Sequence, residues 1–257
     1  FLKHLGWFQY TVQKNHINIK ASIFFLILNG LNFSFAQYPT VREKVMNLPN
    51  FDDRFLHYGY FIGINSYDFK FQYDRDYYWD GNKDIQVASN TGFNVGLVGD
   101  LRINKFINLR IEPGLYYSKR DLIYPEFSQF NKKDDQLREV KSTYIHLPLI
   151  IKLSAERINN FRPFILGGIS TDFNLSSNHK NTDDNFSNVF RTEKQNINYE
   201  LGFGFDFYLF YFKFSPSIRG IFSLQNEIIP DNIENSPWTG YISKMFSRGF
   251  AINLTFE

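Results

Sequence analysis

A strict alternation of apolar and polar residues between Ile197 and Phe207 constrains the fold more than any other feature of the sequence. Every second position of this segment carries an apolar or aromatic side chain, and the positions between them carry Asn, Glu, Gly or Asp. Successive side chains of a β-strand point to opposite faces, whereas a helix would scatter the same apolar residues around its circumference. The segment is therefore predicted to be a β-strand with one apolar face and one polar face.

The same alternation recurs along the chain from His57 onward. Two segments, 58–71 and 161–175, alternate less regularly than the others, and a β-bulge is predicted near Ser66 to account for the break. Five further segments alternate cleanly, namely 93–103, 109–118, 145–153, 212–224 and 250–256. Together with 197–207, these segments predict eight strands.

Strand length and composition favour a membrane-spanning barrel over a soluble β-sandwich. The predicted strands are about ten residues long or longer, as a tilted membrane crossing requires. Full charges such as Arg110 and Glu200 stand in the middle of the polar faces, and the apolar faces are rich in aromatic residues. The chain has 30 Phe and 16 Tyr, yet its mean hydropathy is -0.33. This combination is typical of a barrel, because lipid-facing and lumen-facing residues alternate along each strand.

The predicted connections alternate between short and long. The short ones are 104–106, 156–160 and a bend near Phe210, and the long polar ones are 74–90, 125–137, 178–194 and 228–246. Short periplasmic turns and long outer loops are the arrangement of outer-membrane barrels. We therefore predict an all-β fold over residues 57–257, an eight-stranded antiparallel transmembrane up-and-down β-barrel with both termini in the periplasm.

The residues before the barrel are predicted to be a processing segment and a lead-in. A short apolar stretch, 21–31, follows basic residues and ends at Ser34-Phe35-Ala36, which is typical of a secretory signal with cleavage after Ala36. A membrane anchor helix is the alternative, but the stretch is short and is followed by Asn32. We assign 1–36 to the signal peptide, whose first residues could be an upstream mis-start because the chain begins without Met, and 37–56 to a periplasmic lead-in.

The polar faces of the strands predict a filled lumen. Eight strands leave an interior only wide enough for side chains, and buried charges must be paired. A salt-bridge network that plugs the barrel is therefore favoured over a narrow channel. The candidate network is Asp100, Arg102, Arg110, Glu112, His146, Lys152, Glu200, Asp206, Lys213 and Arg219.

The sequence contains no constellation that predicts an enzyme. There is no cysteine, no residue spacing typical of a metal site and no phosphate-binding loop. The net charge is +2, and no stripe of basic residues that could bind nucleic acid stands out. His146 faces inward and Asp172 on the next strand could reach it, but no nucleophile is specified. We predict a non-enzymatic protein without cofactor or small-molecule substrate. The substitution His146→Ala tests this prediction, because it should abolish the activity of an enzyme but barely affect a scaffold.

Four aromatic residues of the long loops are candidates for contact with a partner: Tyr77, Tyr78, Trp79 and Trp238. Their alternative role is an interfacial aromatic belt or packing within the loops. The sequence alone leaves both roles open.

Two parts of the chain resemble known families. The segments 144–152 (YIHLPLIIK) and 162–168 (RPFILGG) resemble the outer-membrane β-barrel family common in Bacteroidetes. The segments 47–52 (NLPNFD) and 56–65 (LHYGYFIGIN) resemble the start of the PorT family, and this similarity extends over about 37–257.

The resemblance to PorT implies a role in the type IX secretion system. That system exports proteins with C-terminal sorting domains, including gliding adhesins and proteases, and PorT-like barrels support it without a known catalytic site. The implied partners are other subunits of the system and the lipid of the outer membrane. A small lipid-modifying or adhesive barrel is the alternative function.

Overall fold

The computed structural model describes residues 45–74, 84–125, 130, 133–181, 183, 185, 189–233 and 236–257. The predicted signal peptide, 1–36, and the first part of the lead-in lie outside the described residues. The chain divides into two units, Phe1–Val45 and Met46–Glu257, and the following account concerns the second unit.

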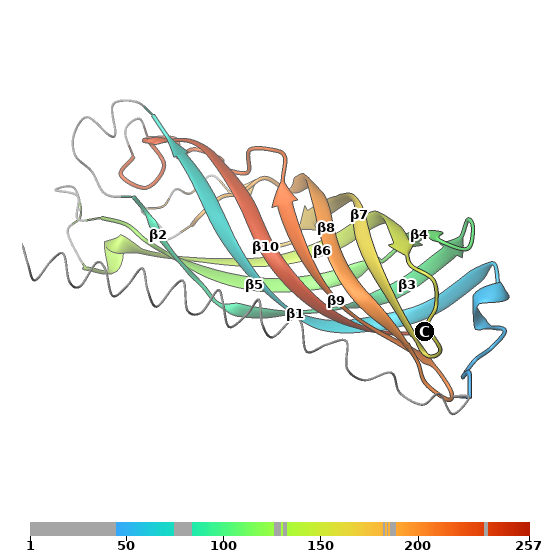
Figure 1. Cartoon of the computed structure of the whole chain (residues 1–257). Helices are drawn as coiled ribbons and strands as arrows, with labels where there is room; N and C mark the ends of the chain where they lie inside the picture. Colours follow the sequence, from blue (N-terminus) through green and yellow to red (C-terminus); the bar gives the residue numbers. More distant parts are fainter. Residues whose placement is uncertain are drawn as a thin grey trace, which may run out of the picture. The chain divides into compact units, whose positions relative to one another are not determined.

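Within its described residues, the second unit has ten strands and two short 3-10 helices (Figure 1). The helices are η2 (Phe51–Asp53) and η3 (Lys133–Gln136). The strands are β1 (Leu56–Tyr73), β2 (Gln86–Ser89), β3 (Thr91–Arg102), β4 (Ile107–Ile111), β5 (Gly114–Ile123), β6 (Leu137–Ser154), β7 (Phe161–Asn174), β8 (Gln195–Tyr208), β9 (Lys213–Ser223) and β10 (Ile242–Phe256). No helix among the described residues is long and apolar enough to cross a membrane.

The strands form one closed antiparallel sheet. Neighbours in the chain pair with each other from β5 round to β10, β3 pairs with both β4 and β5, and β1 pairs on one side with β3 and on the other with β10 (Figure 1). The last strand therefore closes the ring against the first, and the predicted antiparallel up-and-down barrel is confirmed. Closure leaves no unpaired sheet edge along the wall.

The sheet has two more strands than the eight predicted, because two of the eight crossings are interrupted. β2 and β3 are separated by Asn90 alone, and both pair with β5. β4 and β5 are separated by Glu112 and Pro113, and both pair with β3 and with β6. Proline has no backbone N–H to donate to a neighbouring strand, so it is a natural site for such a break. Side chains keep alternating across Pro113, so alternation alone does not detect that interruption, whereas the register with β5 shifts by one residue at Asn90.

The connections follow the predicted alternation of short and long. Short connections, 103–106, 155–160 and 209–212, lie at the end of the barrel where β1 begins and β10 finishes. Long connections, 74–85, 124–136, 175–194 and 224–241, lie at the other end. These ends are called the short-loop end and the long-loop end below.

The outer surface of the wall is apolar. On every crossing the large apolar side chains point outward, as Ile64, Val95, Leu149, Leu201 and Ile252 illustrate with exposed fractions between 41% and 60%. The polar side chains between them point into the barrel and are buried. A surface this apolar is stable only against lipid or a partner.

Near the long-loop end the two faces exchange their chemistry. In β1 the aromatic residues Tyr67 and Phe69 turn inward, where they are 2% and 3% exposed, while Lys70 and Gln72 point outward. The predicted bulge near Ser66 is wrong, because β1 keeps a regular register with β10 up to a shift between Gln72 and Tyr73. Side chains still alternate; only the face that carries the apolar residues changes.

The inward-facing apolar residues form a core within the long-loop end. The cluster contains Phe69, Ile85, Leu122, Tyr124, Val140, Phe190, Ile228, Trp238, Ile242 and Met245. The outward-facing charges beside it form ion pairs, such as Lys119–Glu139 at 3.1 Å and Arg248–Asp68 at 2.6 Å. The barrel thus has a lipid-facing zone with a polar interior and a water-facing zone with an apolar interior.

Arginine substitutions on the outer wall should destabilise the barrel in the lipid-facing zone but not in the water-facing zone. Ile252→Arg places a charge among the apolar residues Ile64 and Ile218, its neighbours in register, and should destabilise the barrel by about 2–4 kcal/mol in lipid vesicles. Gln72→Arg, in the water-facing zone, should change the free energy of unfolding by less than about 0.5 kcal/mol. Equilibrium unfolding in urea measures both, and equal costs would contradict the proposed boundary.

Candidate functional site

Arg110 lies in the lumen, and its guanidinium contacts three carboxylates. Its Nε lies 2.9 Å from Oδ2 of Asp100, its Nη1 lies 3.4 Å from Oε1 of Glu112, and its Nη2 forms an ion pair with Glu257. All four side chains are at most 1% exposed. An ion pair at this depth compensates the cost of desolvation only with several good partners, which Arg110 has.

The network continues from Arg110 toward the long-loop end through Arg219. Its Nη2 lies 2.5 Å from Oε2 of Glu112, and its Nη1 lies 3.8 Å from Oε2 of Glu200. Glu112 is therefore shared between two arginines, one on each side. A run of alternating charges fills this part of the lumen.

His146 is the next member of this run, and it bridges two carboxylates. Its Nδ1 lies 2.5 Å from Oδ1 of Asp172, and its Nε2 lies 2.9 Å from Oε1 of Glu200. The Tyr116 ring packs on the imidazole at 4.4 Å between centroids. The reach of Asp172 to His146 is as predicted, because the two residues face each other in the β6–β7 register. Because the imidazole separates two buried acids, we expect alanine at this position to lower the stability of the barrel.

On the side toward the short-loop end, two lysines complete the network. Lys152 binds both carboxylate oxygens of Asp206, at 2.8 and 2.7 Å, and Ser215 donates to the same carboxylate at 2.6 Å. Lys213 lies 2.8 Å from Oε2 of Glu257. Paired charges therefore run through the interior of the lipid-facing zone, beside smaller apolar clusters such as Ile150, Phe164 and Leu166.

Nine of the ten predicted network residues lie in this buried run, and Arg102 does not. Its side chain is 28% exposed at the short-loop end, where it donates to the Asp52 carbonyl oxygen and lies 3.8 Å from Asp53. Sequence reasoning left Glu257 out of the network. Its place directly after the outward-facing Phe256 was the available signal, since the next residue of an alternating strand faces inward.

Polar contacts lie beside the apolar core, on its side toward the lumen network. The Arg120 guanidinium donates to Ser247 and Ser142 and lies over the Phe69 ring at 3.9 Å. Ser247 in turn donates to Glu227 of the last long connection at 2.8 Å. Burial raises the pKa of the Glu227 carboxyl above its usual range. This contact ties the connection to the barrel interior.

Among the predicted partner-contact residues, only Trp238 lies within the described part of the chain. It is 2% exposed, its indole donates to the Asp135 carbonyl oxygen at 2.8 Å, and the Arg138 guanidinium lies over its ring at 4.5 Å. Trp238 therefore packs within the loops and does not present its ring at the surface. The role of Tyr77, Tyr78 and Trp79 stays a prediction, since these residues lie outside the described ranges.

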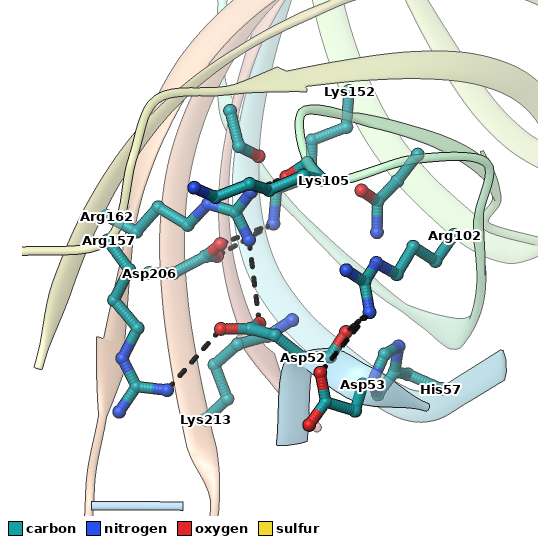
Figure 2. Close-up of a pocket in the computed structure, with 12 residues that line it drawn as sticks. Asp52, Asp53, His57, Arg102, Lys105, Lys152, Arg157, Arg162, Asp206 and Lys213 are labelled. Carbon is teal, nitrogen blue, oxygen red and sulfur yellow. Dashed lines mark hydrogen bonds and ion pairs between the residues drawn. The ribbon is translucent and has the colours of Figure 1, made fainter. Parts of the chain in front are cut away.

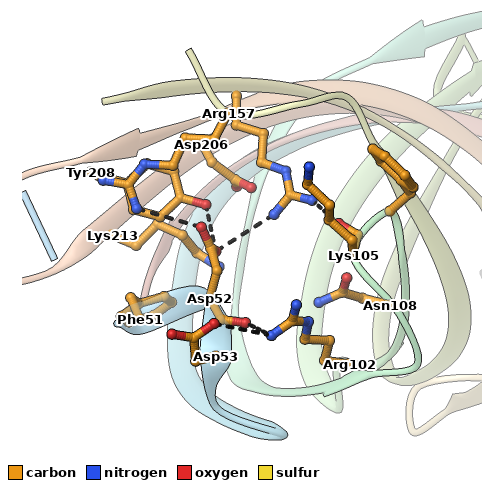
Figure 3. A network of polar contacts seen from close by, with 12 residues as sticks. Phe51, Asp52, Asp53, Arg102, Lys105, Asn108, Arg157, Asp206, Tyr208 and Lys213 are labelled. Carbon is orange, nitrogen blue, oxygen red and sulfur yellow. Dashed lines mark hydrogen bonds and ion pairs between the residues drawn. The ribbon is translucent and has the colours of Figure 1, made fainter. Parts of the chain in front are cut away.

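The short-loop end is covered by the end of the lead-in, which docks through η2 (Figure 3). Asp52 accepts a hydrogen bond from the Tyr208 hydroxyl at 2.8 Å and lies 3.4 Å from Arg157 and 3.5 Å from Arg162. The Phe51 ring stacks on His57 at 4.5 Å between centroids. The segment 47–53 and the side chains that hold it, among them Tyr208, Arg157 and Arg162, are called the lead-in latch below.

The lead-in latch is also held through Asn47, which lies four residues before Phe51. Its backbone N–H donates to Oδ1 of Asn160 at 2.8 Å, and its side-chain Nδ2 donates to the Tyr208 carbonyl oxygen at 3.0 Å. The Arg157 guanidinium donates to the Asn47 carbonyl oxygen and lies 3.5 Å from the centre of the Tyr208 ring. Sequence reasoning assigned no fixed structure to this segment.

The structure is a closed antiparallel barrel with an apolar outer wall, paired charges in the lumen and short turns at one end. These features define a small membrane-embedded barrel protein. The described residues contain no group of three or more His, Cys, Asp or Glu that could hold a metal ion. A model of the outer membrane protein beta-barrel domain family matches residues 35–228, and the chain belongs to this family. It is accordingly an integral protein of the outer membrane.

Solved barrels with low similarity to the chain include OprG of Pseudomonas aeruginosa, at 13% identity and a TM-score of 0.41 over 78% of this chain and 92% of that one. Neisserial surface protein A gives 10% identity and a TM-score of 0.38 over 76% and 95%. The N-terminal β-barrel domain of Pseudomonas aeruginosa OprF gives 10% and 0.31 over 76% and 97%. Similarity at this level carries no information about function. No curated protein matches the chain.

Proposed function

We propose that this protein is a non-enzymatic outer-membrane barrel needed for protein export by the type IX secretion system, for the secretion of sorting-domain cargo and gliding adhesins. The resemblance of 47–52 and 56–65 to the PorT family supports the proposal. A lumen filled by buried ion pairs supports a scaffold in preference to a pore, because conduction needs an open or single-sign path.

The observation that carries the proposal is the lead-in latch. The part of the chain with the most specific resemblance, 47–52, is held in a defined conformation across the short-loop end by Arg157, Arg162 and Tyr208. A segment without a role outside the barrel would need no such set of contacts. We infer that it presents a fixed surface to other subunits of the export machine.

The proposed orientation places both termini and the lead-in latch in the periplasm. Outer-membrane barrels have short turns on the periplasmic side and longer loops outside, and the chain enters and leaves this barrel at its short-loop end. The partners of the latch are then periplasmic or membrane-embedded subunits, and the water-facing zone projects from the cell.

Export of a sorting-domain cargo in a clean deletion strain tests the proposal. We expect the cargo to accumulate inside the cells and export to return with the wild-type gene. A gene that lacks codons 37–51 but keeps the signal peptide should insert a folded barrel without restoring export. Heat-modifiable migration on gels gives the amount of folded barrel, so that the strains are compared at equal levels.

A variant with three residues of the water-facing zone changed, Lys70, Gln72 and Lys244 to alanine, is the matched control for the deletion. All three side chains are exposed, so export should be normal in this strain. Normal export in the clean deletion strain would contradict the export role itself. Normal export with the shortened lead-in alone would contradict the role of the latch.

A further inference from the structure

A cavity of about 330 Å³ lies just inside the lead-in latch, at the short-loop end of the lumen (Figure 2). Its lining carries six lysine or arginine side chains and three aspartates. Two of the lysines are already neutralised, since Lys152 is paired with Asp206 and Lys213 with Glu257. The arginines are the groups whose charge is less completely balanced.

Three arginines of the lining donate mainly to neutral carbonyl oxygens. Arg102 donates to the Asp52 carbonyl, Arg157 donates to the Leu48 carbonyl at 3.2 Å, and Arg162 donates to the Ala155 carbonyl at 2.9 Å. Their nearest carboxylate oxygens, on Asp52 and Asp53, lie at 3.4 to 3.8 Å. These distances are longer than those of a close charge-assisted hydrogen bond, about 2.7–2.9 Å. Positive charge therefore remains available to an anion.

Two buried polar atoms of the lining have no hydrogen-bond partner among the described residues, namely Nδ1 of His57 and Oγ of Ser154. Both residues are only 7% exposed. An unpaired buried polar atom is costly, and natural proteins rarely keep one without a reason. Both residues line a cavity rich in guanidinium groups, and a bound oxyanion would supply the missing partners.

The two unpaired atoms also indicate which oxyanion fits. The Nε2 atom of His57 donates to the Phe51 carbonyl oxygen at 2.8 Å, which leaves Nδ1 as the ring nitrogen without a partner. The Ser154 hydroxyl can donate. A phosphate carries acceptor oxygens and, when one oxygen is protonated, an O–H donor, so it can satisfy both atoms.

We propose that this cavity binds a phosphate monoester group, either as free inorganic phosphate or at the head of a phospholipid such as phosphatidic acid. Arg102, Arg157 and Arg162 supply the charge, and Ser154 and His57 select the protonated oxyanion. The cavity is reached beside Lys105 and Asp53, whose side chains are 61% and 78% exposed. The proposal is independent of the export role.

Isothermal titration calorimetry of the purified full chain in detergent tests binding of free phosphate, with sodium phosphate and sodium sulfate as probes. We expect phosphate to bind and sulfate, which carries no O–H at neutral pH, to bind several-fold more weakly. The same titration in nanodiscs, with and without phosphatidic acid in phosphatidylcholine, tests the lipid source. Binding in one arm identifies the source of the phosphate group.

Arg102→Gln and Ser154→Ala should each weaken binding about tenfold, the effect of one lost hydrogen bond to a charged group. Ser154→Ala removes no ion pair, so it keeps the test valid if the arginine variant folds poorly. Arg248→Gln, which breaks the exposed pair with Asp68, is the matched control and should bind normally. Absence of binding in both arms, equal affinity for sulfate, or equal losses in all three variants would overturn the proposal.

Discussion

Arg110→Met lowers the free energy of unfolding by about 3–5 kcal/mol, because removal of one partner of a buried ion pair leaves uncompensated charge. Arg110 is in contact with three carboxylates in the lumen, and none of the four side chains is more than 1% exposed. Asp100 would lose its ion pair with Arg110 and keep the hydrogen bond from Asn108, while Glu112 would keep Arg219 and Glu257 would keep Lys213. Urea-induced unfolding in lipid vesicles, followed by tryptophan fluorescence, measures the loss.

Arg248→Gln is the control for this prediction, because it removes an ion pair of similar length from the exposed wall of the water-facing zone. Arg248 and Asp68 have side-chain exposures of 53% and 33%, and exposed pairs contribute about 0–1 kcal/mol. The two variants change the same functional group and differ in depth. Equal small losses would show that the lumen network does not stabilise the barrel.

His146→Ala lowers the free energy of unfolding by a similar amount, about 3–5 kcal/mol, because the imidazole lies between two buried acids. Without it, Asp172 and Glu200 face each other across a gap, and the Tyr116 ring loses its packing partner. Addition of Asp172→Asn should recover part of the loss, since it removes one of the two charges while keeping the hydrogen bond from Asn198. Urea unfolding of the single and double variants measures this coupling.

Export by the His146→Ala strain separates a structural histidine from a catalytic one. Compared at equal amounts of folded barrel, export should match the wild-type strain. If the variant folds in the normal amount but export is lost, His146 has a catalytic role. No change in stability would contradict the bridging role.

The strands and their faces could be predicted from the sequence because a strand repeats every two residues, and this period is visible in residues such as 197–207. The interruption at Pro113 could not, since side chains keep alternating across it. At Asn90 the register with β5 shifts by one residue, so the inward-facing residues change from odd to even positions. The exchange of faces after Ser66 was interpreted as a bulge. Periodicity reports that two faces differ, and it does not report which of them meets lipid.

The members of the lumen network were predictable for the same reason, and their pairing was not. Arg219 pairs with Glu112, which lies between β4 and β5. Neither of these strands is adjacent to β9 in the sheet, so the contact depends on the curvature of the closed ring. The structure of the lead-in latch could not be predicted either, because a single turn of 3-10 helix has no periodic pattern in the sequence. Its position depends on Tyr208 and Arg157, which are far away in the chain.

The docking of the lead-in directly before β1 has a mechanical consequence. Only Arg54 and Phe55 separate η2 from β1, so a partner that pulls on the lead-in transmits force along the axis of this strand. Because β1 is hydrogen-bonded to both β3 and β10 over most of its length, the load is shared between two ladders of hydrogen bonds. The seam where the two ends of the chain meet can therefore serve as an anchor point under tension.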